Sequence, residues 1–491
     1  MRCWRTLSLV LVITSSLAAS RALAGPVELL DGVNLSPSDP KLMLLRYRNA
    51  GGGIMVSHDG GKSFAFRCNS AIDPSVQREA SAAVVTASGA LLIGVFDGLW
   101  RGDDNACGFA KASGLAGLWV NDFARDPHDA TRTYLITSSG GKQNGIYVND
   151  GKSDAWTAVG TREDILINRL HVVSTGAKTV RFYESAVRGT YTVAAADGGM
   201  GDELPKYVIR YSDDLGKTWT EHEFGMTDGA VRLLAVDPTD GNRIVVGVLR
   251  DQTNAEGVSL PDDILYSDTA GKPGSFETIG QVTELGGASF APDGRFFYGD
   301  REQTTPALYA VKKLGDAPKK LQSKDKIQCV NYDAPSDTLY VCKDRELCTA
   351  DPSTGALTML FDVTKEDAFV SCDGETAVFD RCQQQLASGW CGITHYPTTP
   401  ICADYHIPGW DSGVPGGDAG VGSGGSAGGG DKGGAGSDAD GGKKSDGKKS
   451  SGGCSSAGGS SRASGVGLGA WLALFAVALL QRRRRATRAA R

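Results

Sequence analysis

Two cysteines and two histidines near residue 400 have a spacing that could bind a metal ion. Cys391 precedes His395 by four positions, and Cys402 precedes His406 by the same interval. Two thiolates and two imidazoles are a common ligand set for Zn²⁺. In an exported chain, which the N-terminus indicates below, a Cys391–Cys402 disulfide with two surface histidines accounts for the same spacing. We therefore expect neither a metal ion nor another cofactor.

Carboxylates are the other side chains that could act on a substrate. Two of them at a defined separation suffice for glycoside hydrolysis, and the chain has 57 acidic residues. The Gly-rich stretch from Asp197 to Asp202 could supply one, with a solvated acidic loop as the alternative. Tyr183 and Glu184 are adjacent, but neighbouring strand residues point to opposite faces, so these two cannot act together. The sequence has no Ser-His-Asp motif, phosphate-binding loop or helix-loop-helix calcium loop.

The cysteines fit an oxidising compartment. Apart from Cys3 and Cys454 there are nine, and seven of them fall within residues 329–402. We expect disulfides to hold this Cys-rich closing region, with Cys68 and Cys107 as candidates to pair across adjacent repeats. Nine is odd, so one thiol is left over or pairs elsewhere. The disulfide candidates are Cys68, Cys107, Cys329, Cys342, Cys348, Cys372, Cys382, Cys391 and Cys402.

A small turn followed by a strand recurs along the body of the chain, residues 25–410. Proline presets φ for such a turn, and Asp or Gly completes it. Successive copies are 40 to 63 residues apart. The clear copies contain Pro37, Pro127, Pro238, Pro292 and Pro335, and the weaker ones contain Ala87 and Thr175.

This interval suits one four-stranded blade per repeat. Seven copies predict an all-β fold, a β-propeller of about seven four-stranded blades over about residues 27–365. An eighth copy of the turn, at Ser371–Gly374, would close the ring or begin an eighth blade. We expect seven blades. The core should come from short strands with alternating apolar residues, such as those at 53–56, 208–211 and 264–266.

A second pattern, Ser-x-Asp-x-Gly-x-x-aromatic, lies inside the repeats. It resembles the Asp-box, or BNR, repeat of sialidase-like propellers. In such a turn the Ser and Asp side chains can bond amides, Gly takes a positive φ, and the aromatic ring packs between sheets. Asn149–Trp156 lacks the central Asp, and Ser267–Phe276 has its aromatic residue two positions late. The two complete copies comprise Ser57, Asp59, Gly61 and Phe64, and Ser212, Asp214, Gly216 and Trp219.

The resemblance implies a fold rather than an activity, because Asp boxes lie away from the active face in that family. By the same resemblance, a sialidase would need an arginine cluster that grips a carboxylate, a Tyr with a Glu partner, and an Asp acid/base. The Arg-Ile-Pro or Arg-Leu-Pro element near the first blade of such enzymes is missing here.

Residues 1–24 have the features of a secretory signal peptide. Arg2 and Arg5 precede the apolar run Leu7–Ile13, and Ala22-Leu23-Ala24 gives a small-x-small cleavage site before Gly25. The apolar run is too short to span a bilayer. We therefore expect export, with cleavage after Ala24.

The C-terminal part predicts a spacer and a tail. Residues 411–465 are almost wholly Gly, Ser, Ala, Asp and Lys, which predicts a disordered linker. Residues 466–480 are apolar and begin a tail, 466–491, in which one hydrophobic helix precedes a basic, cytoplasmic end. A Gly453-Cys454 pair, a short apolar helix and an arginine cluster resemble the bacterial sorting tails called MYXO-CTERM. The cluster is Arg482, Arg483, Arg484 and Arg485.

By that resemblance the protein is bacterial, anchored at the cell surface or outer membrane, and Cys454 is its processing or lipid-attachment position. An ordinary C-terminal membrane helix gives the same topology. Three arginines in residues 1–24 and six in residues 466–491 carry nine positive charges, so the net −6 leaves −15 for the residues between. An acidic body argues against nucleic acid or anionic membrane surfaces as partners of the folded domain.

We expect a monomeric, non-catalytic binding module whose rigid ring presents loops to a protein or a glycan, with the membrane contacted through the tail. The alternative is a surface glycoside hydrolase, sialidase-like or polysaccharide-active, with paired carboxylates at the funnel. Two carboxylates about 5–10 Å apart beside an aromatic platform would favour the hydrolase. A funnel plugged by apolar side chains would favour the binding module.

Overall fold

A computed structural model describes the repeat-bearing part of the chain. All of this part belongs to one compact unit, Met1–Ser412. The second unit, Gly413–Arg491, lies outside the described residues. The predicted signal peptide, linker and hydrophobic helix lie outside them as well. No helix among the described residues is long and apolar enough to cross a membrane. The structure describes residue 382 and residues 30–372 except 48–51, 73–80, 152, 190–205, 225–228, 251–259, 302–305, 323, 344 and 364–369.

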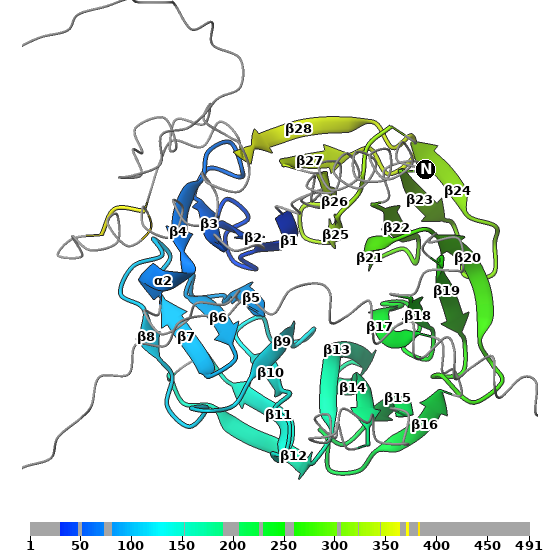
Figure 1. The fold of residues 1–491 in the computed structure, drawn as a ribbon, viewed down its shortest axis with the longest axis horizontal. Helices are drawn as coiled ribbons and strands as arrows, with labels where there is room; N and C mark the ends of the chain where they lie inside the picture. Colours follow the sequence, from blue (N-terminus) through cyan, green and yellow to red (C-terminus); the bar gives the residue numbers. More distant parts are fainter. Residues whose placement is uncertain are drawn as a thin grey trace, which may run out of the picture. The chain divides into compact units, whose positions relative to one another are not determined.

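The described residues form seven antiparallel sheets of four strands, arranged in a ring (Figure 1). Each sheet is built from four consecutive strands. The first four blades consist of β1 (Leu30–Leu35), β2 (Met43–Tyr47), β3 (Gly53–Ser57) and β4 (Ala65–Cys68); β5 (Ala82–Val85), β6 (Leu91–Val95), β7 (Gly98–Gly102) and β8 (Ala110–Lys111); β9 (Val120–Arg125), β10 (Thr133–Thr137), β11 (Asn144–Asn149) and β12 (Thr157–Glu163); and β13 (Leu166–Gly176), β14 (Thr179–Arg188), β15 (Lys206–Ser212) and β16 (Thr220–Phe224).

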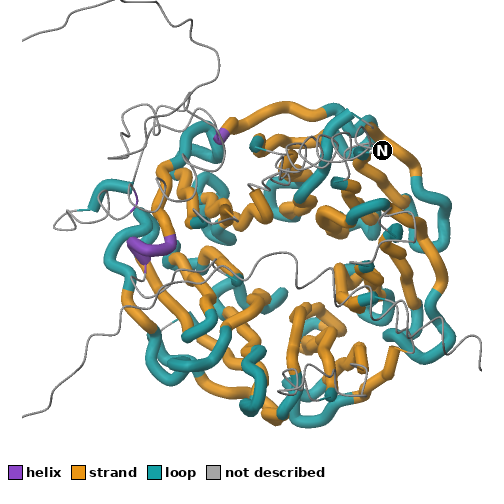
Figure 2. The backbone as a smooth tube through the Cα atoms, viewed as in Figure 1, coloured by secondary structure: helices purple, strands orange, loops and turns teal. Residues whose placement is uncertain are grey.

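The last three blades consist of β17 (Ala230–Val236), β18 (Ile244–Leu249), β19 (Asp262–Ser267) and β20 (Glu277–Val282); β21 (Leu285–Phe290), β22 (Phe296–Asp300), β23 (Ala307–Val311) and β24 (Lys319–Gln322); and β25 (Cys329–Asp333), β26 (Thr338–Lys343), β27 (Glu346–Ala350) and β28 (Leu357–Asp362). Strands make up most of the described ring, and α2 (Asn69–Ile72) is a single helical turn after β4 (Figure 2). The predicted seven-bladed, all-β propeller is therefore confirmed.

The repeated turn of the sequence is the first hairpin turn of each blade. Six copies lie between the first and second strands of a sheet, and the seventh, at Thr175, is the end of the first strand, β13, directly before the turn. The Asp before the proline holds the turn through its side chain: Asp126 Oδ1 accepts the His128 amide at 2.8 Å, and Asp237 Oδ1 accepts the Thr239 amide at the same distance. These bonds form within four residues, so the turn is encoded locally.

The core lies between adjacent blades rather than within one. One apolar cluster joins Tyr134 and Ile136 of blade 3 to Ile167 and Phe182 of blade 4, and the other blade pairs have equivalent clusters. A single four-stranded sheet leaves both of its faces exposed, so each blade depends on two neighbours for burial. The innermost strands contact one another around the ring, and β25 completes it against β1.

Among the described residues, no sheet is shared between the first and last blades of the ring. Instead, the segment after β28 returns across blades 1 and 2, where the Val370 amide donates to the Phe66 carbonyl at 2.9 Å. Cys372 then bonds Cys107, and Cys382 bonds Cys68. We call the described residues of this segment, which are 363, 370–372 and 382, the strap.

The predicted Cys68–Cys107 disulfide is wrong, because the strap brings a separate partner to each of these cysteines. A third disulfide, Cys329–Cys342, joins directly opposed residues of β25 and β26. Cys348 is not in a disulfide: it is a buried thiol whose pKa burial raises to about 11. Cys391 and Cys402 lie outside the described residues. The three disulfides are consistent with an exported protein.

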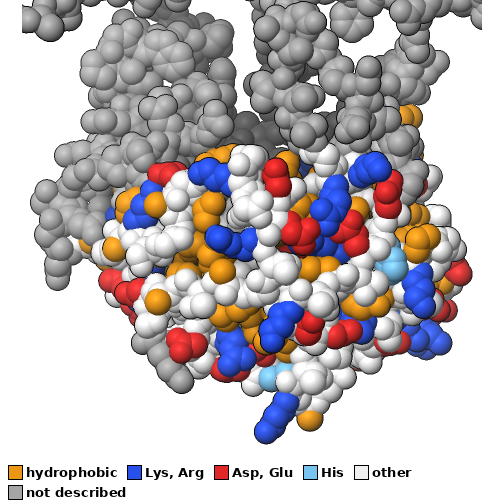
Figure 3. All heavy atoms as spheres, turned by 90° about the horizontal axis from the view of Figure 1, so that it is seen from below, with side chains coloured by type: hydrophobic (Ala, Val, Ile, Leu, Met, Phe, Trp, Pro, Cys, Tyr) orange, Lys and Arg blue, Asp and Glu red, His pale blue; other side chains and the backbone are white. Residues whose placement is uncertain are grey.

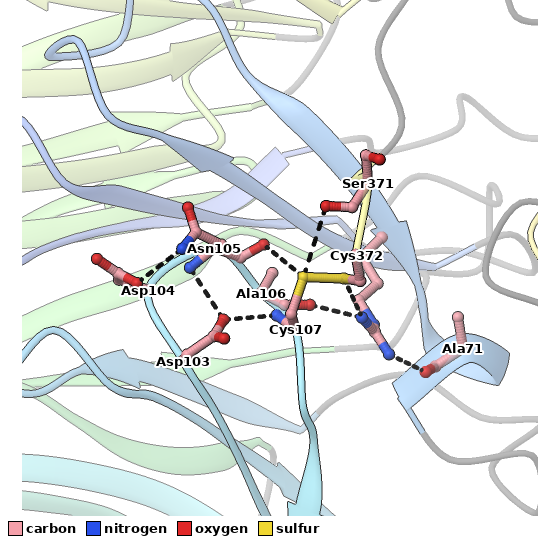
Figure 4. Close-up of a disulfide and its surroundings, with 9 residues drawn as sticks. Ala71, Asp103, Asp104, Asn105, Ala106, Cys107, Ser371 and Cys372 are labelled. Carbon is pink, nitrogen blue, oxygen red and sulfur yellow. Dashed lines mark hydrogen bonds between the residues drawn. A yellow bond between two sulfur atoms is a disulfide. The ribbon is translucent and has the colours of Figure 1, made fainter. Parts of the chain in front are cut away.

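Arg67 links blade 1, blade 2 and the strap at one point. This point lies beside the Cys107–Cys372 disulfide, which Figure 4 shows. The Arg67 side chain is 2% exposed, and it donates to the Ala106 carbonyl at 2.6 Å and to the Ala71 carbonyl at 2.5 Å. Its guanidinium also lies 3.4 Å from Cys372 Sγ. Because Cys372 is bonded to Cys107, this cluster holds the strap onto the seam between the first two blades.

Candidate functional site

A cavity of about 480 Å³ runs along the axis of the ring, and the innermost strands of all seven blades line it. We call it the channel. Its size falls within the roughly 300–1,000 Å³ range of ligand-binding pockets. Every blade presents one strand edge to the channel, so side chains distant in sequence converge there. The channel is therefore the candidate functional site.

The charged side chains that line the channel are mostly basic. Arg46 comes from β2, Arg125 from β9, Arg169 from β13 and Arg232 from β17, whereas Asp122 of β9 is the only carboxylate among the described lining residues. Four arginines and one aspartate give the channel a formal charge of +3. The chain as a whole carries −6. A recess of one sign within a low-dielectric wall concentrates ions of the opposite sign.

Asp122 is engaged by the neighbouring blade. Its Oδ1 lies 3.3 Å from Arg169 Nη1, and its Oδ2 accepts the Leu170 amide at 3.1 Å. Asn121 adds two bonds to the same blade through Nδ2. This carboxylate therefore positions β13 against β9, and Arg169 is the channel arginine that it neutralises.

Two further basic side chains differ in their state of charge. Burial lowers the pKa of Arg125, while Asp333 opposes the shift, and an arginine so placed stays protonated at neutral pH. Its Nη2 donates to the Val85 carbonyl at 2.9 Å and to the Leu35 carbonyl, so it braces blades 1 and 2. Burial lowers the pKa of His171 to about 4 despite the nearby Asp122, so this imidazole is neutral.

The channel has neither the carboxylate pair expected of a hydrolase nor the apolar plug expected of a binding module among its described lining residues. It is not plugged by apolar side chains, since arginines line it, and its described lining residues offer no second carboxylate to work with Asp122. A glycosidase needs both an acid and a base or nucleophile. What the arrangement can do chemically is bind an anionic group. In the part of the chain that the structure describes, no group of three His, Cys, Asp or Glu side chains could hold a metal ion.

The residues of the two Ser-x-Asp turns lie away from the channel, between the third and fourth strands of blades 1 and 4. Ser57 Oγ accepts the Gly61 amide at 2.9 Å, and Asp59 Oδ1 accepts the Lys62 and Ser63 amides. Phe64 is 3% exposed and packs against the last blade. These side chains hold their turns closed.

The turn of blade 4 repeats this geometry. Ser212 Oγ accepts the Gly216 amide at 2.8 Å, and Asp214 Oδ1 accepts the Thr218 amide at 2.9 Å. Trp219 stacks under Arg210, whose guanidinium carbon lies 4.3 Å from the ring centroid.

These turns predict a dependence of stability on acid. Hydrogen bonds lower the pKa of Asp214 to about 2, and those accepted by Asp59 lower its pKa to about 2 against the opposing effect of burial. Because both folded-state pKa values lie below the unfolded value near about 4, this stabilisation is complete above about pH 4 and is lost as the pH falls towards 2. We expect D59N/D214N to lose less thermal stability than wild type between about pH 5 and about pH 2. Parallel melting curves would contradict this.

Tyr183 and Glu184 point to opposite faces of β14, as expected. Tyr183 Oη donates to the Gly241 carbonyl at 2.7 Å on the blade 5 side, whereas Glu184 Oε2 accepts from Arg210 Nε at 2.7 Å in the buried seam with blade 3. The acidic stretch 197–202 and the cysteines and histidines of residues 391–406 lie outside the described residues.

Sequence reasoning missed the channel arginines. A signal was present, because Arg232 interrupts an otherwise apolar β17, and Arg169 lies between the apolar residues Ile167 and Leu170 of β13. A charged side chain on the innermost strand of a propeller blade can reach solvent by pointing into the channel. The outer rim, in contrast, carries acidic and basic side chains intermingled (Figure 3). The excess of basic side chains is thus found in the channel lining and not on the part of the rim that Figure 3 shows.

No family model matches this chain, and no curated protein does. The fold is similar to that of solved propellers. A GH74 enzyme of Niastella koreensis is 14% identical, over 69% of this chain and 66% of that one, with a TM-score of 0.38. An ancestral GH74 enzyme is 11% identical over 68% and 46%, with a TM-score of 0.48. The propeller domain of the Trilobed protease from Pyrococcus furiosus is 13% identical over 69% and 99%, with a TM-score of 0.43.

This chain thus spans less than two thirds of either GH74 enzyme. Identities of this size reach no further than fold, and the assignment rests on the seven sheets themselves. The chain is a seven-bladed β-propeller with a basic central channel.

Proposed function

We propose that this protein is an exported, non-catalytic recognition propeller that binds an acidic glycan in its channel without cleaving it. The observation that carries the proposal is the composition of the channel wall: four arginines from four strands, and one carboxylate already paired with Arg169. Guanidinium groups bind carboxylate and sulfate oxygens through two parallel hydrogen bonds. The same wall lacks the second carboxylate that hydrolysis requires among its described residues.

The tail belongs to the same proposal. Cys454 and the cluster Arg482–Arg485 would process and anchor the chain at the bacterial surface, by their resemblance to MYXO-CTERM tails. The linker 411–465 would hold the propeller away from the membrane as a monomer with its loops free. The Ser-x-Asp turns, by their resemblance to Asp boxes, would stabilise the propeller and would not contact the ligand.

The test is a glycan array of uronic acid and sulfated oligosaccharides probed with the full chain, followed by hydrolysis assays on each glycan that binds. We expect binding that weakens as salt is added, because exposed charges are screened, and no release of shortened products. Product release would overturn the non-catalytic assignment. Binding confined to neutral glycans would overturn the role of the channel.

Two single substitutions at the channel ion pair are expected to act in opposite directions. D122N removes the only described carboxylate of the lining, so it should tighten the binding of an acidic oligosaccharide, whereas R169Q should weaken it. One unit charge near a ligand in a partly solvated site changes the affinity about threefold to tenfold. Calorimetric titration at low and high salt measures both effects.

Arg169 is 36% exposed and Asp122 is 14% exposed, and the two substitutions conserve shape, so stability should change by about 1 kcal/mol or less. Equal melting temperatures are the control for folding. If both variants shift affinity in the same direction, the change reflects loss of the β9–β13 contact, and charge recognition in the channel is excluded.

A further inference from the structure

A smaller cavity, of about 180 Å³, lies between blades 2 and 3 on the face that carries the first hairpin turns. We call it the Trp156 pocket. Leu92 and the half-buried ring of Trp156 supply its apolar walls, and the ring also packs against the apolar cluster between these blades. Polar side chains stand around the ring, and these are Thr131, Asn149, Arg101 and Asp154.

The pocket arises where the third-to-fourth-strand turn departs from its pattern in the other blades. Phe64 lies 4.5 Å from Phe361, and Phe276 lies 4.7 Å from Phe224, centroid to centroid, so those aromatic rings are covered by other rings. Trp219 is covered by Arg210. Trp156 instead forms the wall of an open cavity.

The altered turn has its own hydrogen bonds. Gly151 replaces the central Asp and takes a φ of 75°, and a side chain there would meet the Thr131 carbonyl. Asn149 Nδ2 donates to the carbonyls of Ser153 and Ala155 at 2.7 and 2.9 Å. Hydrogen bonds of the Asn149 side chain therefore hold this turn without the carboxylate of the central Asp. The acidic group moves three residues on, to Asp154, which forms an ion pair with Arg101 of blade 2.

We propose that the Trp156 pocket binds one pyranose ring of a neutral glycan. A pyranose has an apolar C–H face and a rim of hydroxyl groups, and it matches an aromatic ring that is surrounded by amide, hydroxyl and charged side chains. Arg101 and Asp154 are 41% and 69% exposed, so they can bond sugar hydroxyls at the pocket mouth.

An adjoining cavity of about 600 Å³ shares Arg101 and Asp154 and gives room for further sugar units. Asp103, Asp104 and Lys111 also line it, so three acidic side chains of the groove face two basic ones. Such a groove repels an anionic chain, whereas the channel attracts one. The occupant is accordingly a neutral, linear glycan, distinct in chemistry from the ligand of the channel.

Calorimetric titration of the full chain with cellohexaose and with maltohexaose tests this inference. These two neutral glucose hexamers differ in linkage, so they also report the shape of the groove. We expect wild type to bind one of them, W156A to bind it about tenfold more weakly, and W156F to retain most of the affinity. R101Q and D154N should each weaken it about threefold without a change in melting temperature, which covers the case in which W156A does not fold.

F96A is the matched control, because Phe96 is an exposed aromatic residue, 47% accessible, that lies in another turn and stacks on Trp119. It should leave binding unchanged. The site is disproved if neither hexamer binds at millimolar concentration, or if W156A binds as wild type does. R169Q should not affect the hexamers and W156A should not affect acidic glycans, so failure of this site and failure of the channel proposal give different results.

Discussion

Replacing the four cysteines of both strap disulfides by serine is expected to lower the free energy of unfolding by at least about 5 kcal/mol. Cys68–Cys382 and Cys107–Cys372 close loops of 314 and 265 residues, and a disulfide removes more entropy from the unfolded chain when its loop is longer. The last and first blades share an apolar cluster but no sheet hydrogen bonds in the described residues, so the strap disulfides are the covalent links across this closure.

The third disulfide offers a matched comparison. Cys329–Cys342 spans 13 residues, for which the same model gives about 3 kcal/mol, so C329S/C342S should be the milder variant in urea unfolding. Reductant added to folded wild type is a second route if the fourfold variant does not fold. Hydrogen exchange should then rise first in β1–β4 and β25–β28. An equal rise in all seven blades would show that the strap does not close the ring.

R210M is expected to destabilise the folded state by about 3–5 kcal/mol at neutral pH. Arg210 is 1% exposed, and Nε and Nη1 each lie 2.7 Å from a carboxylate, that of Glu184 and that of Glu163. Glu184 is completely buried. Removal of the guanidinium leaves its charge without a partner in the seam between blades 3 and 4.

Acid should relieve this defect. Burial raises the pKa of Glu184 and Arg210 opposes the rise, so without Arg210 the pKa moves further up. A group whose folded-state pKa is raised stabilises the fold below its unfolded pKa, and this contribution is lost as the pH rises through the folded value. The deficit of R210M should therefore shrink between about pH 7 and about pH 5.

Neutralising the partner is the control. R210M/E184Q should recover most of the lost stability at neutral pH, because no uncompensated charge stays buried. Urea unfolding of the single and double variants at both pH values measures this coupling. A double variant that is no more stable than R210M would mean that the loss comes from packing against Trp219 and not from charge.

The features that local chemistry determines were predictable from the sequence. All seven hairpin turns follow from Pro, Asp and Gly within a few residues, as at Asp126 and Asp237, and their spacing predicts the blade number. The turn at Ser57 is similarly local, since its bonds span at most four residues.

The features that depend on the path of the whole ring were not predictable. Cys68 and Cys107 lie in adjacent blades, but their partners follow some 300 residues later, on a strap whose route no local pattern encodes. The channel site likewise assembles single residues, such as Arg46 and Arg232, from blades far apart in sequence. Periodicity places these residues on strands, and only ring closure makes them neighbours.

The most direct test of the channel as the recognition site is anomalous diffraction from crystals soaked in selenate, an oxyanion that resembles a sulfate group. The predicted result is a selenium peak in the channel within hydrogen-bonding reach of Arg169 and Arg232, which is lost in R169Q crystals. Selenate that occupies only the outer rim, with water alone in the channel, would contradict the account.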